Sequence, residues 1–175
     1  MPKIEVAWDE YLNETTDRLP DGLLLTSLDP EGKPNTMAIG WASIGIVWSR
    51  PMFIVLVRHS RYTYECIEAT GDFTVNVPAP GMAEAVKFCG SVSGRDHDKF
   101  AECGLTVGQS QTITSPYIDE CELVYECKVV QHTDVVPENF VPEIIDKFYA
   151  GGDFHRIYFG QILRTIAEEG FTGRD

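Results

Sequence analysis

The sequence predicts an α+β fold, mainly β, in which helices are inserted into an antiparallel β-barrel. Runs of β-branched and apolar residues with strand-like patterning dominate the chain. Helical segments separate these runs irregularly, which argues against a doubly wound parallel sheet. With 175 residues and 43% hydrophobic content, the chain can bury one sizeable core. We therefore expect residues 1–175 to form a single domain, with a core at about residues 20–168 and a polar C-terminal tail.

The N-terminal part is expected to contain a β-hairpin followed by a buried strand. Residues 23–28 are rich in β-formers, the DPEGKP segment has turn chemistry, and residues 35–43 return as a second strand. Residues 52–58, MFIVLVR, form a nearly continuous apolar run. Such a run is typical of a strand that is buried on both faces.

The rest of the chain mixes helices and strands. Ser60 can cap a helix that runs through Ala69 and ends at Gly71. Alternating apolar residues from Cys121 to Val129 predict a long, half-buried strand. Further elements are expected at residues 73–77 (strand), 82–89 (helix), 142–149 (short helix) and 157–165 (strand).

Charge and hydropathy exclude several classes of partner. The net charge is −13, so the field of the whole molecule disfavours nucleic acid and anionic membrane surfaces. The opening MPKIEVAWDEY lacks the apolar stretch of a signal peptide. The uncharged run at residues 34–49 is shorter than the ~20 apolar residues of a membrane helix. We expect a cytoplasmic protein.

The cysteines and the absent motifs narrow the chemistry. Five cysteines without a signal peptide fit reduced thiols. Cys121 and Cys127 would lie ~20 Å apart along one strand, so they cannot share a metal. We find no GxGxxG after a strand, no GxxxxGK[ST], no HExxH and no G-x-S-x-G. No metal site is expected.

Residues 87–100, KFCGSVSGRDHDKF, are suited to holding an anion. Gly90, Ser93 and Gly94 let the backbone approach a ligand closely, while Arg95 and Lys99 add positive charge. The alternative is an ordinary helix cap and connector.

Together with RHSRYT at residues 58–63 and GDFTVNVP at residues 71–78, this segment gives the chain its resemblance to a known family. The order of the three segments resembles the flavin reductase-like family, the flavoredoxin type of FMN-binding split barrel, over residues 23–166. The resemblance implies bound FMN and a homodimer.

Arg58, Ser60 and Thr63 combine a guanidinium with hydroxyls at a helix start, which suits a phosphate. Alternatively, Ser60 only caps the helix and Arg58 only pairs with an acidic neighbour. The resemblance adds Lys99 to the phosphate site and places the flavin ring on the strand TMAIGWAS. The implied cofactor-binding residues are Thr36, Met37, Ala38, Trp41, Ala42, Ser43, Arg58, Ser60, Thr63, Asn76, Cys89, Gly90, Ser93 and Lys99.

Three residues in this reading have open roles. Trp41 is either a core residue or a stacking wall, and Asn76 is a buried amide whose partner is either the ligand or the backbone. The resemblance makes His155 the catalytic residue at the open face of the flavin; the alternative is a surface or hydrogen-bonding histidine. Two features depart from the family pattern: Gln161 replaces a common glutamate, and residues 134–153 form an insertion.

The implied function is an NAD(P)H-dependent flavin or ferric-type reductase, with NADH or NADPH as a possible co-substrate. One alternative is a flavoredoxin-like electron carrier that exchanges electrons with a redox protein partner. Another is a dimeric interaction module without the cofactor.

Overall fold

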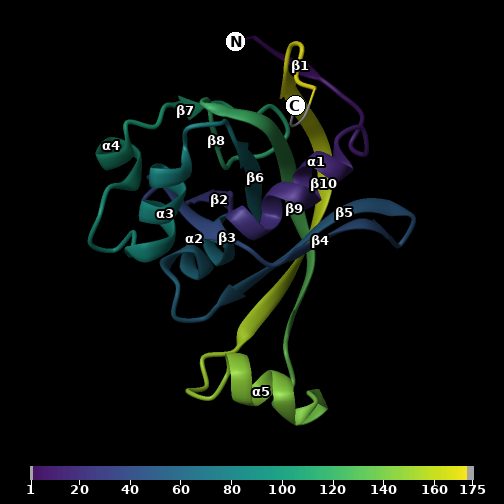
Figure 1. Cartoon of the computed structure of the whole chain (residues 1–175), viewed down its shortest axis with the longest axis vertical. Helices are drawn as coiled ribbons and strands as arrows, with labels where there is room; N and C mark the ends of the chain where they lie inside the picture. Colours follow the sequence, from purple (N-terminus) through teal and green to yellow (C-terminus); the bar gives the residue numbers. More distant parts are fainter. Residues whose placement is uncertain (1, 173–175) are drawn as a thin grey trace.

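The computed structural model describes residues 2–172 and shows an antiparallel sheet with short helices inserted between its strands (Figure 1). The strand order is β3-β2-β6-β9-β10-β5-β4, and β1 pairs with β10. The α+β antiparallel fold predicted from the sequence is thereby confirmed. The strands are β1 (Lys3–Glu5), β2 (Leu23–Leu28), β3 (Pro34–Ile39), β4 (Ala42–Val47), β5 (Arg50–Arg58), β6 (Asp72–Pro78), β7 (Val107–Gly108), β8 (Tyr117–Ile118), β9 (Cys121–Asp134) and β10 (His155–Glu168). The helices are α1 (Leu12–Arg18), η1 (Leu19–Asp21), α2 (Tyr62–Thr70), α3 (Ala83–Ser91), α4 (Lys99–Cys103), η2 (Pro137–Asn139) and α5 (Pro142–Phe148).

The strand pairing is interrupted between β3 and β4. These two strands follow each other in sequence but lie at opposite ends of the strand order. The single strand expected over residues 35–43 is therefore wrong. β3 pairs with β2 as far as Ile39, and after Gly40 and Trp41 the chain pairs with β5, where Ala42 lies opposite Val55. Residues 40–41 thus bridge the two ends of the sheet, and this break shapes the candidate site.

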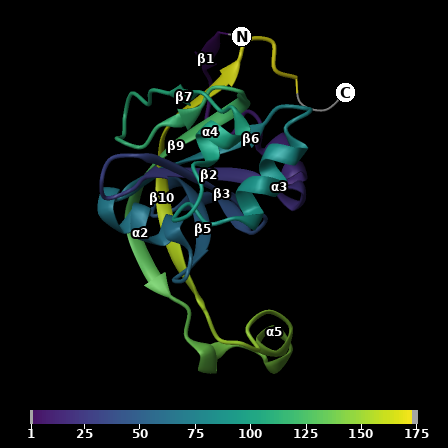
Figure 2. The same cartoon turned by 90° about the vertical axis from the view of Figure 1, so that its left-hand side faces the viewer.

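The core has two parts, one on each face of the sheet. Inside the curved sheet, Leu25, Phe53 and Tyr125 belong to one buried cluster. Outside it, Leu24 packs in a second cluster with Val86 of α3 and other residues of α3, α4 and β8. Helix α2 contributes Ile67 to the inner cluster, whereas α3 and α4 pack in the outer one. Figure 2 shows α3 and α4 near each other.

The burial of β9 and of β5 differs from what the sequence predicts. The first half of β9 is buried on both faces, because β8 and the loops around it cover the outer side. By contrast, β5 alternates between buried and partly exposed residues, and Ile54 and Leu56 are among the partly exposed ones. The expectations of a half-buried β9 and a doubly buried β5 are therefore both wrong.

The insertion at residues 134–153 forms an arm. The distal parts of β9 and β10 extend away from the body and carry η2 and α5 at their tip (Figure 1). The short helix expected at residues 142–149 is confirmed as α5. The arm returns to the body near the end of β5, where Arg58 lies opposite His155 in the sheet.

Two chain segments differ from expectation near their ends. Helix α2 begins at Tyr62 with Arg61 as N-cap, so Ser60 is not its cap, whereas Gly71 ends it in a left-handed conformation as expected. The tail expected to be polar contains Phe171, which is buried and packs edge-on against Tyr11 at 4.8 Å. Residues 173–175 of that tail lie outside the described part of the chain.

Among residues 2–172, no helix is long and apolar enough to cross a membrane. In the same range, no three His, Cys, Asp or Glu side chains are grouped so that they could hold a metal ion. All five cysteines are free thiols, as expected.

Candidate functional site

Two neighbouring hollows lie where β3 ends. The first, which we call the anion pocket, has a volume of about 300 Å³ and lies between the end of β3, the start of α2 and the turn after α3. The second, the Trp41 cleft, has a volume of about 210 Å³. Met37, Ala38 and Arg61 line both hollows, so the two adjoin.

Backbone N–H groups converge on the anion pocket. Tyr62 and Thr63 form the first turn of α2, and Ser93 and Gly94 lie in the turn after α3. None of these four N–H groups has a hydrogen-bond partner among residues 2–172. Unpaired N–H groups at a helix start are a ready anion-binding arrangement.

Two buried side chains add further donors. Lys99 is 5% exposed, and its ammonium group donates to the carbonyls of Thr36 and Cys89, both at 2.8 Å. An ammonium group has three N–H donors, so one remains for a ligand. Thr63 Oγ1 accepts a hydrogen bond from Asn35 at 2.9 Å, which leaves its own proton free to donate. Burial lowers the pKa of Lys99, and a bound anion would oppose that shift.

Glycine is required in the turn that borders this pocket. A Cβ at Gly94 would lie 1.9 Å from Asn35 Oδ1, and one at Gly90 would lie 3.1 Å from the Cβ of Ala38. These close approaches bring the end of α3 and the following turn against β3. The interpretation of residues 87–100 as a mere connector does not explain such packing around a cluster of donors.

Arg61 is a pocket residue that was not among the expected cofactor-binding residues, although its positive charge beside Arg50 and Arg58 suits a small anion. Its guanidinium lines both hollows and makes no hydrogen bond or ion pair with the described residues. Its positive charge also lowers the pKa of Lys99, although less than burial does. Two cations that share a hollow are stabilised by an anion between them. The signal was in RHSRYT, where the second arginine precedes the helix.

Arg58 has a different role from the one expected. Its guanidinium donates to the carbonyls of Asp153 at 2.6 Å and Phe148 at 3.0 Å, and it lies over the Tyr149 ring. It lines the Trp41 cleft, not the anion pocket. Arg58 therefore fastens the arm to the body.

Ser60 also binds the arm. Its hydroxyl donates to Asp153 Oδ2 at 2.7 Å, and its N–H points to Asp153 Oδ1 at 3.3 Å. The hydroxyl lies at the edge of the anion pocket but is already occupied. The cap expected for Ser60 is replaced by this contact with the arm. The acidic partner expected for Arg58 is present, because Asp153 Oδ2 lies 3.9 Å from Arg58 Nη1.

The Trp41 cleft has apolar walls and a backbone edge. It is lined by Met37, Ala38, Ile39, Gly40, Trp41, Leu56, Arg58, Arg61 and His155. Trp41 is 42% exposed. The centroid of its ring lies 5.1 Å from that of the Phe148 ring and 5.3 Å from that of the His155 ring. Trp41 is therefore a wall of the cleft and not a core residue.

His155 lies at this cleft and is held by the arm. Its Nδ1 lies 2.6 Å from the hydroxyl of Tyr149, and both side chains are buried. Burial, followed by the charge of Arg58, lowers the pKa of His155 to about 4. The imidazole is therefore neutral at neutral pH. His155 is buried and not on the surface, and its contact with Tyr149 fits the alternative of a hydrogen-bonding residue.

Several residues expected at the cofactor do not present their side chains to it. Asn76 is fully buried; its amide donates to Leu24 O at 3.0 Å and accepts from Ile118 N at 2.9 Å. It joins β2, β6 and β8, so its place in the ligand site is wrong. Ala42 and Ser43 lie on β4 beyond the lining of both hollows.

Thr36 and Cys89 act through their backbones. The Thr36 hydroxyl accepts from the Thr26 hydroxyl and donates to the Leu25 carbonyl, both on β2. Burial raises the pKa of the Cys89 thiol to about 12. Their carbonyls hold Lys99. Met37, Ala38, Thr63, Gly90, Ser93 and Lys99 do border the anion pocket, as expected.

Comparison with known proteins places the chain in a family. The model of the flavin reductase like domain matches residues 17–172. An uncharacterised protein of Archaeoglobus fulgidus is 33% identical over 139 residues, which cover 79% of this chain and 68% of that protein. The chain spans 68%, 62% and 51% of the lengths of three curated relatives it matches.

Solved structures share the fold. Flavoredoxin from Methanosarcina acetivorans has a TM-score of 0.70 at 29% identity, covering 98% of this chain and 78% of that one. An FMN-binding domain of a flavin reductase-like enzyme from Shewanella baltica has a TM-score of 0.68 at 20% identity, covering 96% and 78%. With the family match across most of its length, the chain belongs to the flavin reductase-like domain family.

Proposed function

We propose that the protein is an FMN-dependent oxidoreductase that holds the FMN phosphate in the anion pocket. The observation that carries this proposal is the set of unsatisfied donors there: four backbone N–H groups, the Thr63 hydroxyl, the third N–H of Lys99 and the Arg61 guanidinium. A phosphate dianion has enough acceptor oxygens to satisfy such a set. The expected cofactor-free interaction module would leave these donors without a purpose.

The flavin ring would lie in the Trp41 cleft. Ala38 and Gly40 are small, so a planar ring can approach the backbone edge of β3, while Leu56 and Trp41 offer apolar cover. The cleft and the pocket adjoin, which suits a molecule with a phosphate at one end and a ring at the other. FMN would supply the electron-transfer chemistry, and the protein would supply binding and orientation.

His155 is the residue we place next to the reacting ring. With the Tyr149 hydroxyl donating to Nδ1, the neutral imidazole carries its proton on Nε2. Such an N–H can donate to an acceptor atom of the cofactor or the incoming substrate. Tyr149 is then a positioning residue, because it sets the tautomer of His155.

NADH or NADPH is the proposed electron donor, with a flavin or a ferric complex as acceptor. An electron carrier that receives electrons from a protein partner is the second candidate. The arm favours it, because Val136 and Val141 at its tip are 48% and 63% exposed beside several acidic residues. Apolar side chains rimmed by charge are typical of a surface that binds a protein. We place either form, as a single-domain homodimer, in the cytoplasm.

Spectroscopy on the purified protein tests the FMN proposal. We expect a flavin absorption band, as isolated or after FMN is added, and much weaker binding of riboflavin, which lacks the phosphate. A protein that quenches neither FMN nor riboflavin fluorescence would contradict the cofactor. Equal affinity for the two would contradict the phosphate site.

Turnover separates the two candidates. An NAD(P)H-dependent reductase oxidises NADH or NADPH in the presence of free flavin or a ferric complex. A carrier loaded with FMN shows no such oxidation but exchanges electrons with a chemical reductant. The FMN spectrum serves as the common control for both assays.

A further inference from the structure

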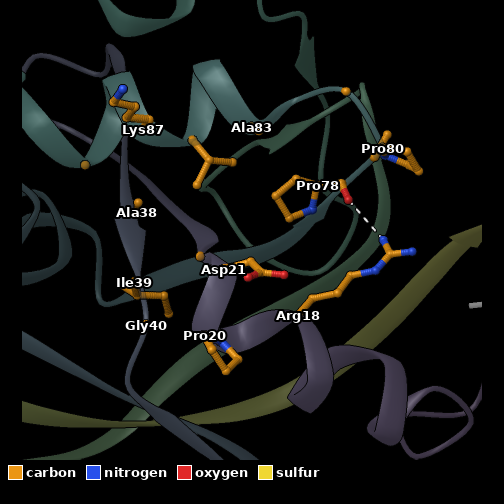
Figure 3. A pocket seen from close by; sticks show the side chains of 15 residues that line it. Arg18, Pro20, Asp21, Ala38, Ile39, Gly40, Pro78, Pro80, Ala83 and Lys87 are labelled. Atoms are coloured by element: carbon orange, nitrogen blue, oxygen red, sulfur yellow. Dashed lines mark hydrogen bonds between the residues drawn. The ribbon is translucent and has the colours of Figure 1, made fainter. Parts of the chain in front are cut away.

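A cavity of about 700 Å³ lies beside the end of β3, where Ala38, Ile39 and Gly40 line it (Figure 3). We call it the proline cavity. It is bounded by η1, by residues 38–40, by the loop after β6 and by α3. Its volume lies within the roughly 300–1,000 Å³ of small-molecule sites. Neither the phosphate nor the ring of the proposed cofactor needs this space.

The walls of this cavity are apolar and firm. Pro20, Pro78 and Pro80 line it together with Ile39 and Val86. Proline has a fixed φ, so these walls lose little freedom when a ligand binds. A Cβ at Gly22 would lie 2.7 Å from Val86, which shows that η1 and α3 are in close contact at one side of the cavity.

The charges are unequal at the two ends. Lys87 lies at one end, and Asp21 and Arg18 lie toward the other (Figure 3). Arg18 serves the fold, because its guanidinium donates to Pro78 O at 3.0 Å and to Glu122 at 2.6 Å. The Lys87 side chain is exposed, and its ammonium group makes no hydrogen bond or ion pair within residues 2–172.

We propose that the proline cavity binds a small molecule with an apolar ring body and one anionic group, which lies at Lys87. The apolar walls match the ring body. The anion gains from the unpaired ammonium group at one end and avoids the carboxylate of Asp21 toward the other. A cationic ligand of the same shape would instead be repelled by Lys87 and attracted by Asp21.

The cavity adjoins the proposed cofactor site. Ala38, Ile39 and Gly40 line both the proline cavity and the Trp41 cleft, and Gly90 lines both the proline cavity and the anion pocket. A ligand in the cavity would lie at the same end of β3 as the flavin ring. A role of this ligand as a redox substrate therefore rests on the proposed function. The binding of the ligand to the proline cavity does not.

Calorimetry with a matched pair of probes tests the site on the full-length protein, with and without FMN. The probes are 2-naphthoate, which is anionic, and 2-naphthamide, which is neutral and nearly the same shape. We expect naphthoate to bind at least about tenfold more tightly than naphthamide. Lys87→Met should remove this preference, while Lys128→Met, an exposed lysine remote from the cavity, should retain it.

A second variant tests the cavity itself. Ala83 is exposed at the start of α3 and lines the cavity, so Ala83→Trp fills it without disturbing the core. We expect this variant to lose both probes, and Ala101→Trp on the exposed face of α4 to bind them normally. Equal binding of the two probes, an unchanged preference in Lys87→Met, or no binding by the unaltered protein would each overturn the proposal.

FMN titration of the same variants separates this proposal from the proposed function. Lys87→Met and Ala83→Trp should bind FMN as the unaltered protein does. Probe binding in a protein that fails to bind FMN would support the cavity and contradict only the cofactor. If the unaltered protein binds FMN but neither probe, because a second copy of the chain covers α3, only the proposal for the proline cavity is contradicted.

Discussion

At the scale of single residues, two arginines three positions apart have opposite roles. Arg61 is unpaired in the hollow, whereas Arg58 is bonded to two carbonyls of the arm. We expect Arg61→Gln to weaken FMN binding by about tenfold to a hundredfold, because a charge-assisted contact contributes roughly 1.5–3 kcal/mol. Fluorescence titration measures this loss, and thermal unfolding should be nearly unchanged.

Arg58→Gln is the matched variant. It should retain most of the FMN affinity but lower the melting temperature and increase hydrogen exchange in the arm. The opposite pattern, with Arg58 needed for FMN and Arg61 not, would restore the sequence-based assignment of the phosphate site.

His155 makes the stability of the protein depend on pH. Burial, more than the charge of Arg58, lowers its pKa from 6.5 to about 4 in the folded state. Between these values the unfolded chain binds more protons than the folded one, so stability is full above about pH 6.5 and falls as the pH drops toward 4.

Compared with His155→Gln, the unaltered protein should therefore lose about 2 kcal/mol more between pH 7 and pH 5. Urea unfolding at the two pH values measures this difference. The glutamine variant corrects for the carboxylates that titrate in the same range. Parallel curves for the two proteins would show that His155 is not held neutral.

At the scale of elements, the sequence shows which segments are strands but not which neighbours cover them. The hairpin of β2 and β3, the helix end at Gly71 and the arm helix were all predictable from local signals. The break at Gly40 was not, because TMAIGWAS carries no strong turn signal, and only pairing with β5 ends β3 there. Burial of β5 and β9 depends on distant parts of the chain in the same way.

The candidate site was predictable to the same degree. The Gly-rich segment and Lys99 were found from anion chemistry and the family resemblance. Asn76 was misplaced because a buried amide looks the same in sequence whether its partner is a ligand or Ile118 N. Arg61 and Tyr149 were not assigned to the site, because their places depend on where α2 starts and where the arm folds back.

The arm should affect the chemistry through Tyr149. Tyr149→Phe removes the hydroxyl that hydrogen-bonds to His155 Nδ1 while retaining the ring packed against Phe154 and Arg58. We expect FMN affinity to stay within about twofold, because the phosphate contacts are untouched. Flavin reduction should slow in stopped-flow measurements, and the ¹⁵N shifts of His155 should show a mixture of tautomers.

Tyr158→Phe is the control for that experiment. Tyr158 is a buried tyrosine of β10 whose hydroxyl donates to Glu68 at 2.7 Å, away from the cleft. It should lower stability without changing the tautomer of His155. If both tyrosine variants slow reduction equally and neither alters the ¹⁵N shifts, Tyr149 has only a structural role.

At the scale of the whole molecule, the acidic charge limits the kinds of partner, and an uncovered sheet face indicates assembly. The net charge of −13 keeps the protein from polyanions, while the hollows at the end of β3 carry local positive charge. On β4 and its turn, Ile46 and Trp48 are 59% and 58% exposed, next to a hollow of about 350 Å³ lined in part by Val130. Exposed apolar side chains around a hollow are typical of a protein interface.

We therefore expect a two-fold homodimer that covers the β4–β5 hairpin, since a large apolar contact of this kind is the usual route to a stable pair. Replacing both Ile46 and Trp48 with Asp should give a folded monomer in light scattering at micromolar concentration. Val107→Asp, at an exposed apolar residue of β7, should remain dimeric. If a partner subunit completes the flavin pocket, the monomeric variant should also bind FMN less tightly. A monomeric unaltered protein would contradict the dimer, and a monomeric variant with full FMN affinity would show that one chain builds the whole site.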